Sequence, residues 1–185
     1  MITLDNYLNV ITQRLAPYYD VFQDEMVAGE KWDLLARFKM RSEKYFFLKE
    51  IKLFAYENHE IVLVRGIDQV TAQTAEHFAA CLKKVVADLV QPSDEHMSTV
   101  LTGILVATGG ITPQGRQTIE RFRYSRNFSF LLRGWCDVRL LAVDLTAHEV
   151  YSNKAGRAVR EAYCIAEGKE GQVGTSSASV SSVSG

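Results

Sequence analysis

The stretch from residue 32 to residue 66 constrains the fold most strongly, because polar and apolar side chains alternate along it as they do in β-strands. We predict one strand from Trp32 to Met40, a second from Tyr45 to Tyr56 and a third from Glu60 to Arg65. A turn near Ser42 would join the first two strands in an antiparallel hairpin. Apolar side chains fall on both faces toward the third strand, so this meander must be covered on two sides.

Apolar residues at three- and four-residue spacing predict helices before and after the meander. In chain order, the expected elements are a helix from Leu4 to Leu15, a short helix from Tyr18 to Gly29, the meander, a helix from Thr71 to Val90, a strand from Thr99 to Ala107, a helix from Thr112 to about Ser125, strands from Phe128 to Leu132 and from Val138 to Leu145, and a helix from Asn153 to Tyr163. This order predicts an α/β domain, α+β-like, whose mixed sheet opens with a three-strand antiparallel meander and carries helices on both faces.

The composition indicates how the chain is organised. Its 185 residues, 47% of them hydrophobic, are enough for one domain with its own core. After residue 167 the sequence consists mostly of Gly, Ser, Thr and Val, with almost no charge. We therefore predict a single globular domain over residues 1–167 and a disordered tail over residues 168–185.

Charge and cysteine content exclude several classes of protein. A formal net charge of -1 excludes a strongly basic nucleic-acid binder in the bulk sense. Three cysteines, Cys81, Cys136 and Cys164, lack C-x-x-C spacing, so neither a disulfide framework nor a zinc knuckle is expected. Metal-ligand spacing is also not seen among the histidines, which are His59, His77, His96 and His148. No segment has the pattern of a secretory signal or a membrane span, so we expect a cytoplasmic protein.

Three charged side chains of the meander could carry chemistry. Asp33 is followed, after sixteen residues, by Glu50-Ile51-Lys52, and the predicted register places Asp33 opposite Lys52 on the face that also holds Glu50. This acid followed by acid-x-lysine, with the order of elements over residues 1–108, resembles the restriction-endonuclease-like superfamily. The resemblance implies a Mg²⁺-dependent nuclease in which Asp33 and Glu50 bind the metal and Lys52 orients water or stabilises phosphate.

The same residues also fit a structural interpretation. Asp33 and Lys52 would form a directly opposed cross-strand ion pair, and Glu50 would lie diagonally from Arg37. Such pairs contribute about 0.2 to 1 kcal/mol and need no function. We favour this interpretation, under which no cofactor is expected; Mg²⁺ is required only by the nuclease hypothesis.

A second candidate is electrostatic. Residues 116–161 hold nine Lys and Arg against five acids, whereas the start of the chain is acidic. Arg116 and Arg123 are seven residues apart and should share one face of the predicted helix, and Arg126 and Arg133 follow. Aromatic residues interleave with them, as in proteins that bind single-stranded nucleic acid. The partners that fit this basic half are nucleic acid, an acidic protein surface, or the acidic start of a second copy in a homo-oligomer.

Three hypotheses about function follow. The first is a non-catalytic binding or regulatory domain that uses the basic C-terminal half. The alternatives are a divalent-metal-dependent nuclease that uses Asp33, Glu50 and Lys52, and a structural or self-associating protein. Gly109-Gly110 could present backbone N–H groups to a phosphate, but the G-x-G-x-x-G and P-loop patterns are absent, so a plain turn is expected there.

Overall fold

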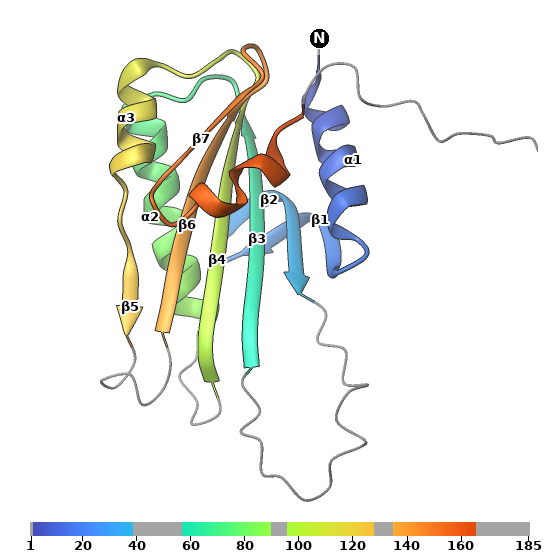
Figure 1. The fold of residues 1–185 in the computed structure, drawn as a ribbon, viewed down its shortest axis with the longest axis vertical. Coiled ribbons are helices and arrows are strands. Elements are labelled where there is room, and N and C mark those ends of the chain that lie inside the picture. The colour runs from blue at the N-terminus through green and yellow to red at the C-terminus, as the bar shows by residue number, and fades with distance from the viewer. Residues whose placement is uncertain (1, 39–56, 90–95, 128–134, 166–185) are drawn as a thin grey trace, which may run out of the picture.

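The computed structural model describes residues 2–38, 57–89, 96–127 and 135–165, which form four helical segments and one seven-stranded sheet (Figure 1). In chain order the elements are α1 (Leu4–Leu15), β1 (Tyr19–Val27), β2 (Glu30–Phe38), β3 (Glu57–Ile67), α2 (Ala72–Leu89), β4 (His96–Ala107), α3 (Pro113–Arg121), β5 (Ser125–Asn127), β6 (Trp135–Asp144), β7 (Glu149–Ser152) and the 3-10 helix η2 (Arg157–Tyr163).

The sheet is mixed and follows the strand order β1-β2-β3-β4-β6-β5, with β7 also paired to β6. Its opening strands β1, β2 and β3 are antiparallel neighbours, whereas β3, β4 and β6 run parallel. Helices α2 and α3 connect the parallel strands, as parallel pairing requires a long crossover. This architecture confirms the predicted fold class, an α/β domain whose mixed sheet opens with a three-strand antiparallel meander.

Two apolar layers hold the sheet between helices, which confirms the prediction of helices on both faces (Figure 1). Because successive strand residues point to opposite faces, Leu63 of β3 packs with Phe78 and Leu82 of α2 on one side. Its neighbour Val62 packs with Ile11 of α1 on the other side. We call this second side the α1 face; η2 also lies against it.

The prediction of a helix from Tyr18 to Gly29 is wrong, because this segment is β1. Its helix-like spacing came from Tyr18, Phe22 and Met26, which are 65%, 44% and 63% exposed and therefore form no buried stripe. A two-residue turn, Ala28-Gly29, joins β1 to β2 with φ values of 54° and 75°. Positive φ at both central residues is the requirement of the tight hairpin turn that suits strand twist.

The meander also differs from the predicted one. Residues 34–37 of β2 pair with β1 along one edge and with residues 61–64 of β3 along the other. The predicted register between Trp32–Met40 and Tyr45–Tyr56, which set Asp33 opposite Lys52, is therefore wrong. The turn near Ser42 and the second predicted strand lie outside the described residues.

Helix α3 begins as predicted and ends earlier. Thr112 caps it by accepting a 3.0 Å hydrogen bond from the backbone N–H of Gly115, and Pro113 occupies the first turn. The helix stops at Arg121, and residues 125–127, near its predicted end at Ser125, form strand β5. Gly110, with φ of +93°, makes the corner before the cap, which agrees with the expected plain turn.

Several other predictions can be compared with the structure. The helix Thr71–Val90 and the strands Thr99–Ala107 and Val138–Leu145 are confirmed as α2, β4 and β6. The final helix is shorter than predicted and is a 3-10 helix, η2. The predicted strand Phe128–Leu132 and the predicted tail over residues 168–185 lie outside the described residues. Among the residues that are described, no helix is both long enough and apolar enough to cross a membrane.

Gly103 of β4 provides a test of how tightly α2 packs on the sheet. A methyl group added there would overlap Cδ1 and Cδ2 of the fully buried Leu82. We expect Gly103→Ala to lower the free energy of unfolding by roughly 1 to 3 kcal/mol, measured by urea denaturation. In a Leu82→Ala background the overlap is gone, so the penalty should shrink. An equal penalty in both backgrounds would contradict this packing.

Candidate functional site

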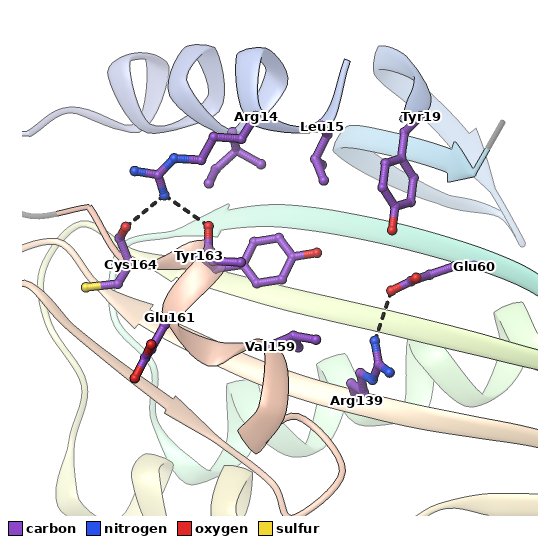
Figure 2. A pocket seen from close by; sticks show the side chains of 11 residues that line it. Arg14, Leu15, Tyr19, Glu60, Arg139, Val159, Glu161, Tyr163 and Cys164 are labelled. Carbon is purple, nitrogen blue, oxygen red and sulfur yellow. Dashed lines mark hydrogen bonds and ion pairs between the residues drawn. The ribbon is translucent and has the colours of Figure 1, made fainter. Parts of the chain in front are cut away.

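A pocket of about 580 Å³ opens on the α1 face, between α1, η2 and the sheet (Figure 2). Its walls are mainly apolar, and its polar groups come from four separate parts of the chain. The lining residues are Ile11, Arg14, Leu15, Tyr19, Glu60, Arg139, Val159, Glu161, Ala162, Tyr163 and Cys164. This volume lies within the usual range for small-molecule sites, roughly 300 to 1,000 Å³.

An ion pair forms the charged floor of the pocket. Nη1 of Arg139 lies 2.9 Å from Oε1 of Glu60, and both side chains are partly buried. Glu60 is on β3 and Arg139 on β6, so the pair spans the intervening strand β4. The alternation of side chains along each strand explains why the two charges come together. Glu60 is two residues before Val62, and Arg139 is two residues before Leu141. Because Val62, Val64, Leu141 and Val143 all lie on the α1 face, Glu60 and Arg139 lie on it as well.

Two tyrosines stand beside this ion pair. Figure 2 shows the hydroxyl of Tyr19 directed toward Glu60. Burial, followed by the negative charge of Glu60, raises the pKa of Tyr19 far above its usual value. The same two causes raise the pKa of Tyr163. Both phenols therefore stay protonated at physiological pH and can donate hydrogen bonds.

Arg14 holds residues 162–164 next to the pocket through hydrogen bonds to their backbone. Its Nη1 donates to the backbone carbonyls of Ala162 at 2.9 Å and of Cys164 at 2.8 Å (Figure 2). Below it, the buried hydroxyl of Tyr7 donates to the carbonyl of Tyr163 at 3.1 Å. Helix α1 thus fixes η2 through charged and neutral hydrogen bonds to the backbone, and the gap between the two helices becomes the pocket.

The structure places Asp33 away from this pocket. Asp33 lines a smaller hollow of about 340 Å³ together with Asp5 and Asp24, and its Oδ2 accepts a 2.7 Å hydrogen bond from the backbone N–H of Gly66. Glu50 and Lys52, the other two members of the predicted site, lie outside the described residues. That they come near Asp33 stays a prediction, although the hairpin register from which it was inferred is wrong.

The predicted basic residues are dispersed. Arg116 forms an ion pair with Glu120 at 2.9 Å, and its guanidinium stacks over the ring of Tyr151 at 4.4 Å. Arg123 lies beyond the end of α3 and donates to the backbone carbonyls of Glu120 and Phe122. The expectation that its spacing puts it on one helical face with Arg116 is therefore wrong.

Two other basic residues complete this comparison. Arg126 is exposed at β5, and Arg133 lies outside the described residues.

Arg116 and Arg160 line a hollow of about 370 Å³, but Glu149 and Glu161 line it as well. The arginines there are matched by acids, so this hollow has no excess of positive charge.

Sequence reasoning missed most of the polar residues of the pocket. The sequence predicts Glu60 only as the first residue of a strand and places Tyr19 in a helix. One signal was available: a single charged residue on a strand face that is otherwise apolar, as in Glu60-x-Val62-x-Val64. Two such strands on the same face, β3 and β6, are what bring Glu60 and Arg139 together.

The fold and the pocket define a mixed-sheet α/β domain with a concave site on one face of its sheet. A family model described as a domain of unknown function (DUF8052) matches residues 3–165, so the chain belongs to this family. The match covers every helix and strand of the described structure. No curated protein and no solved structure matches the chain.

The role of Arg14 can be tested by removing its guanidinium. We expect Arg14→Ala to lower the free energy of unfolding by roughly 1 to 2 kcal/mol, because two hydrogen bonds from a charged donor are lost. Hydrogen exchange of the amides of residues 157–165 should become faster. Arg157→Ala, which removes an exposed cation from η2 itself, is the control and should leave this exchange unchanged. If both variants changed the exchange of these amides equally, Arg14 would not hold η2 in place as described.

Proposed function

We propose that this chain is a non-catalytic binding domain that takes a small amphipathic molecule into the pocket between α1 and η2. The observation that carries the proposal is the convergence of an ion pair and two protonated phenols inside apolar walls. A concave, mainly apolar site with a few convergent polar groups of perturbed pKa is typical of ligand-binding pockets.

The charges of the pocket indicate the class of ligand. Two carboxylates, those of Glu60 and Glu161, are balanced by the guanidinium groups of Arg14 and Arg139. A ligand with a net charge would leave one of these groups without compensation in a partly buried site, which costs free energy. A neutral or zwitterionic head group avoids that cost. The apolar body of the ligand would contact Ile11, Leu15 and Val159.

The polar groups of the head would then have defined partners. The hydroxyls of Tyr19 and Tyr163 and the remaining N–H groups of Arg139 can donate to acceptor oxygens of the ligand. Glu60 can accept from an ammonium, amide or hydroxyl group. Arg139 belongs to the basic C-terminal half of the chain, but the proposed site uses none of the predicted binding residues Arg116, Arg123, Arg126 and Arg133.

The state of the titratable groups supports binding rather than catalysis. The two phenols have raised pKa values, so neither can act as a base near neutral pH. The carboxylate of Glu60 is already paired with the guanidinium of Arg139. The thiol of Cys164 at the rim donates to the backbone carbonyl of His148 at 3.7 Å. None of these contacts joins a nucleophile to a base.

Four probes with the same apolar body and different head groups test the proposal. We expect the zwitterion L-phenylalanine and the neutral 2-phenylacetamide to shift the backbone NMR resonances of residues around the pocket, and phenylacetate and phenethylammonium to do so more weakly. At ten times its dissociation constant, a ligand should raise the melting temperature by roughly 3 to 6 °C. The proposal is wrong if none of the four probes perturbs these resonances.

A matched pair of variants locates the binding. Val159→Trp fills the pocket and should abolish the shifts caused by L-phenylalanine. Val150→Trp places the same bulk in the neighbouring hollow of Arg116 and should leave them in place. Equal binding by wild type and Val159→Trp would show that the probes bind elsewhere and would reject the pocket as the site.

A divalent-metal-dependent nuclease of restriction-endonuclease-like fold is the second candidate. The observed order of a helix, three antiparallel strands, a helix and a parallel fourth strand supports it, and Asp33 lies on the second of those strands. Less favourably, Asp33 already accepts a hydrogen bond from the N–H of Gly66, and the β3 residues that pair with Leu34–Arg37, residues 61–64, include no acid. Mg²⁺-dependent cleavage of DNA or RNA that is abolished by Asp33→Asn would favour this candidate over the binding domain.

A further inference from the structure

A cluster of three metal-binding side chains lies on the opposite face of the sheet from the pocket. Glu30 begins β2, and His77 and Cys81 are four residues apart on α2, so both project from the same side of that helix. One carboxylate oxygen, one imidazole nitrogen and the thiol sulfur lie within 4.8 Å of one another. Among the described residues, no other group of three such side chains meets this criterion.

The separation of the sulfur and the nitrogen fits a shared metal ion. Sγ of Cys81 lies 3.6 Å from Nε2 of His77. A tetrahedral zinc ion with Zn–S of about 2.3 Å and Zn–N of about 2.0 to 2.1 Å holds its sulfur and nitrogen ligands about 3.5 to 3.6 Å apart. The carboxylate of Glu30, whose oxygen lies within 4.8 Å of both of these atoms, is available as the third ligand.

The three side chains of the cluster differ in their exposure to solvent. Cys81 is buried, the Glu30 side chain is partly exposed and His77 is exposed, so an ion can enter past the histidine and reach the thiol. Burial raises the pKa of the Cys81 thiol, which argues against a free thiolate nucleophile at this position. A soft metal ion is the chemistry that best uses a buried thiol beside an imidazole.

Two cations, Arg65 and Lys84, contact the side chains of the cluster, and a bound metal ion would compete with these contacts. Arg65 contacts Glu30 at 3.5 Å and the sulfur of Cys81 at 3.9 Å, and Lys84 approaches Glu30 at 3.7 Å. Arg65 is anchored independently, because it donates to the carbonyl of Lys31 and stacks over Trp32 at 4.3 Å. Arg65 can therefore stay in place as a hydrogen-bond donor to a metal-bound sulfur, while the exposed Lys84 swings away.

We propose that Glu30, His77 and Cys81 form a binding site for a zinc-like divalent metal ion, with a fourth coordination position open to water. Three protein ligands and an open position distinguish such a site from a closed structural zinc site. Because Arg65 and Lys84 reduce the negative charge of the cluster, the site should hold zinc less tightly than a four-cysteine site does. The proposal is independent of the pocket, which lies on the other face.

Titration of the intact protein with Co²⁺ tests the proposal, because a cobalt–thiolate bond gives a near-ultraviolet charge-transfer absorption. We expect this absorption to saturate at one equivalent and to disappear when Zn²⁺ is added. Cys81→Ser should lose the absorption. His77→Gln, which alters an exposed side chain and should leave the fold intact, should weaken Co²⁺ binding by at least about tenfold, since even groups outside the ligand shell change metal affinity roughly 10- to 100-fold.

Cys164→Ser provides the matched thiol control, because this cysteine lies near the pocket and away from the cluster. It should give the same titration as the wild type, and circular dichroism should show that all variants are folded. The proposal would be overturned if the wild type gave no charge-transfer absorption. It would also be overturned if His77→Gln bound Co²⁺ as tightly as the wild type, or if Cys164→Ser removed the signal.

Discussion

The burial of three parallel strands on both faces is the constraint on which the rest of the structure depends. Strands β3, β4 and β6 carry apolar side chains toward both layers, so the sheet is stable only when each face is covered. Helices α2 and α3, which connect these strands, cover one face. The other face is covered by elements from the two ends of the domain, α1 and η2, which are joined through Arg14, Tyr7 and the backbone of residues 162–164.

Less helix covers the α1 face than the opposite face, because α1 and η2 have 12 and 7 residues whereas α2 and α3 have 18 and 9, and the pocket is the consequence. Helix α1 and the short η2 leave part of the α1 face between them, and there the strands present Glu60 and Arg139 in place of aliphatic side chains. A charged pair at such a place is not expected to add much stability, because partial desolvation offsets its Coulomb attraction. What it supplies is a fixed arrangement of donors and acceptors, and such preorganisation favours binding.

The sequence predicted the fold class because α2 has strong helical periodicity and β4 is an almost uninterrupted apolar run; the predicted bounds of α2, β4 and β6 are each within a few residues of the observed ones. It failed at β1, where Phe22 and Met26 imitate a helical stripe although both are exposed; the pairing of β1 with β2 outweighed local spacing. The pocket could not be read from spacing, because Glu60 and Arg139 are 79 residues apart and meet only through parallel register. His77 and Cys81, by contrast, are four residues apart on a correctly predicted helix, so their spacing alone predicts that they share one side of it.

The central claim is that the α1 face holds Glu60 and Arg139 in an environment less polar than the protein surface. Two double-mutant cycles, one for each ion pair, test it most directly. Arg116 and Glu120 form an ion pair with the same 2.9 Å separation, but their side chains are 51% and 44% exposed, whereas those of Arg139 and Glu60 are 24% and 29% exposed. Glutamine replaces each residue singly and together, and unfolding free energies give the two coupling energies. The surface pair should couple by about 0.3 to 0.5 kcal/mol and the pocket pair by clearly more. Equal coupling, or weaker coupling for Glu60 and Arg139, would contradict the account.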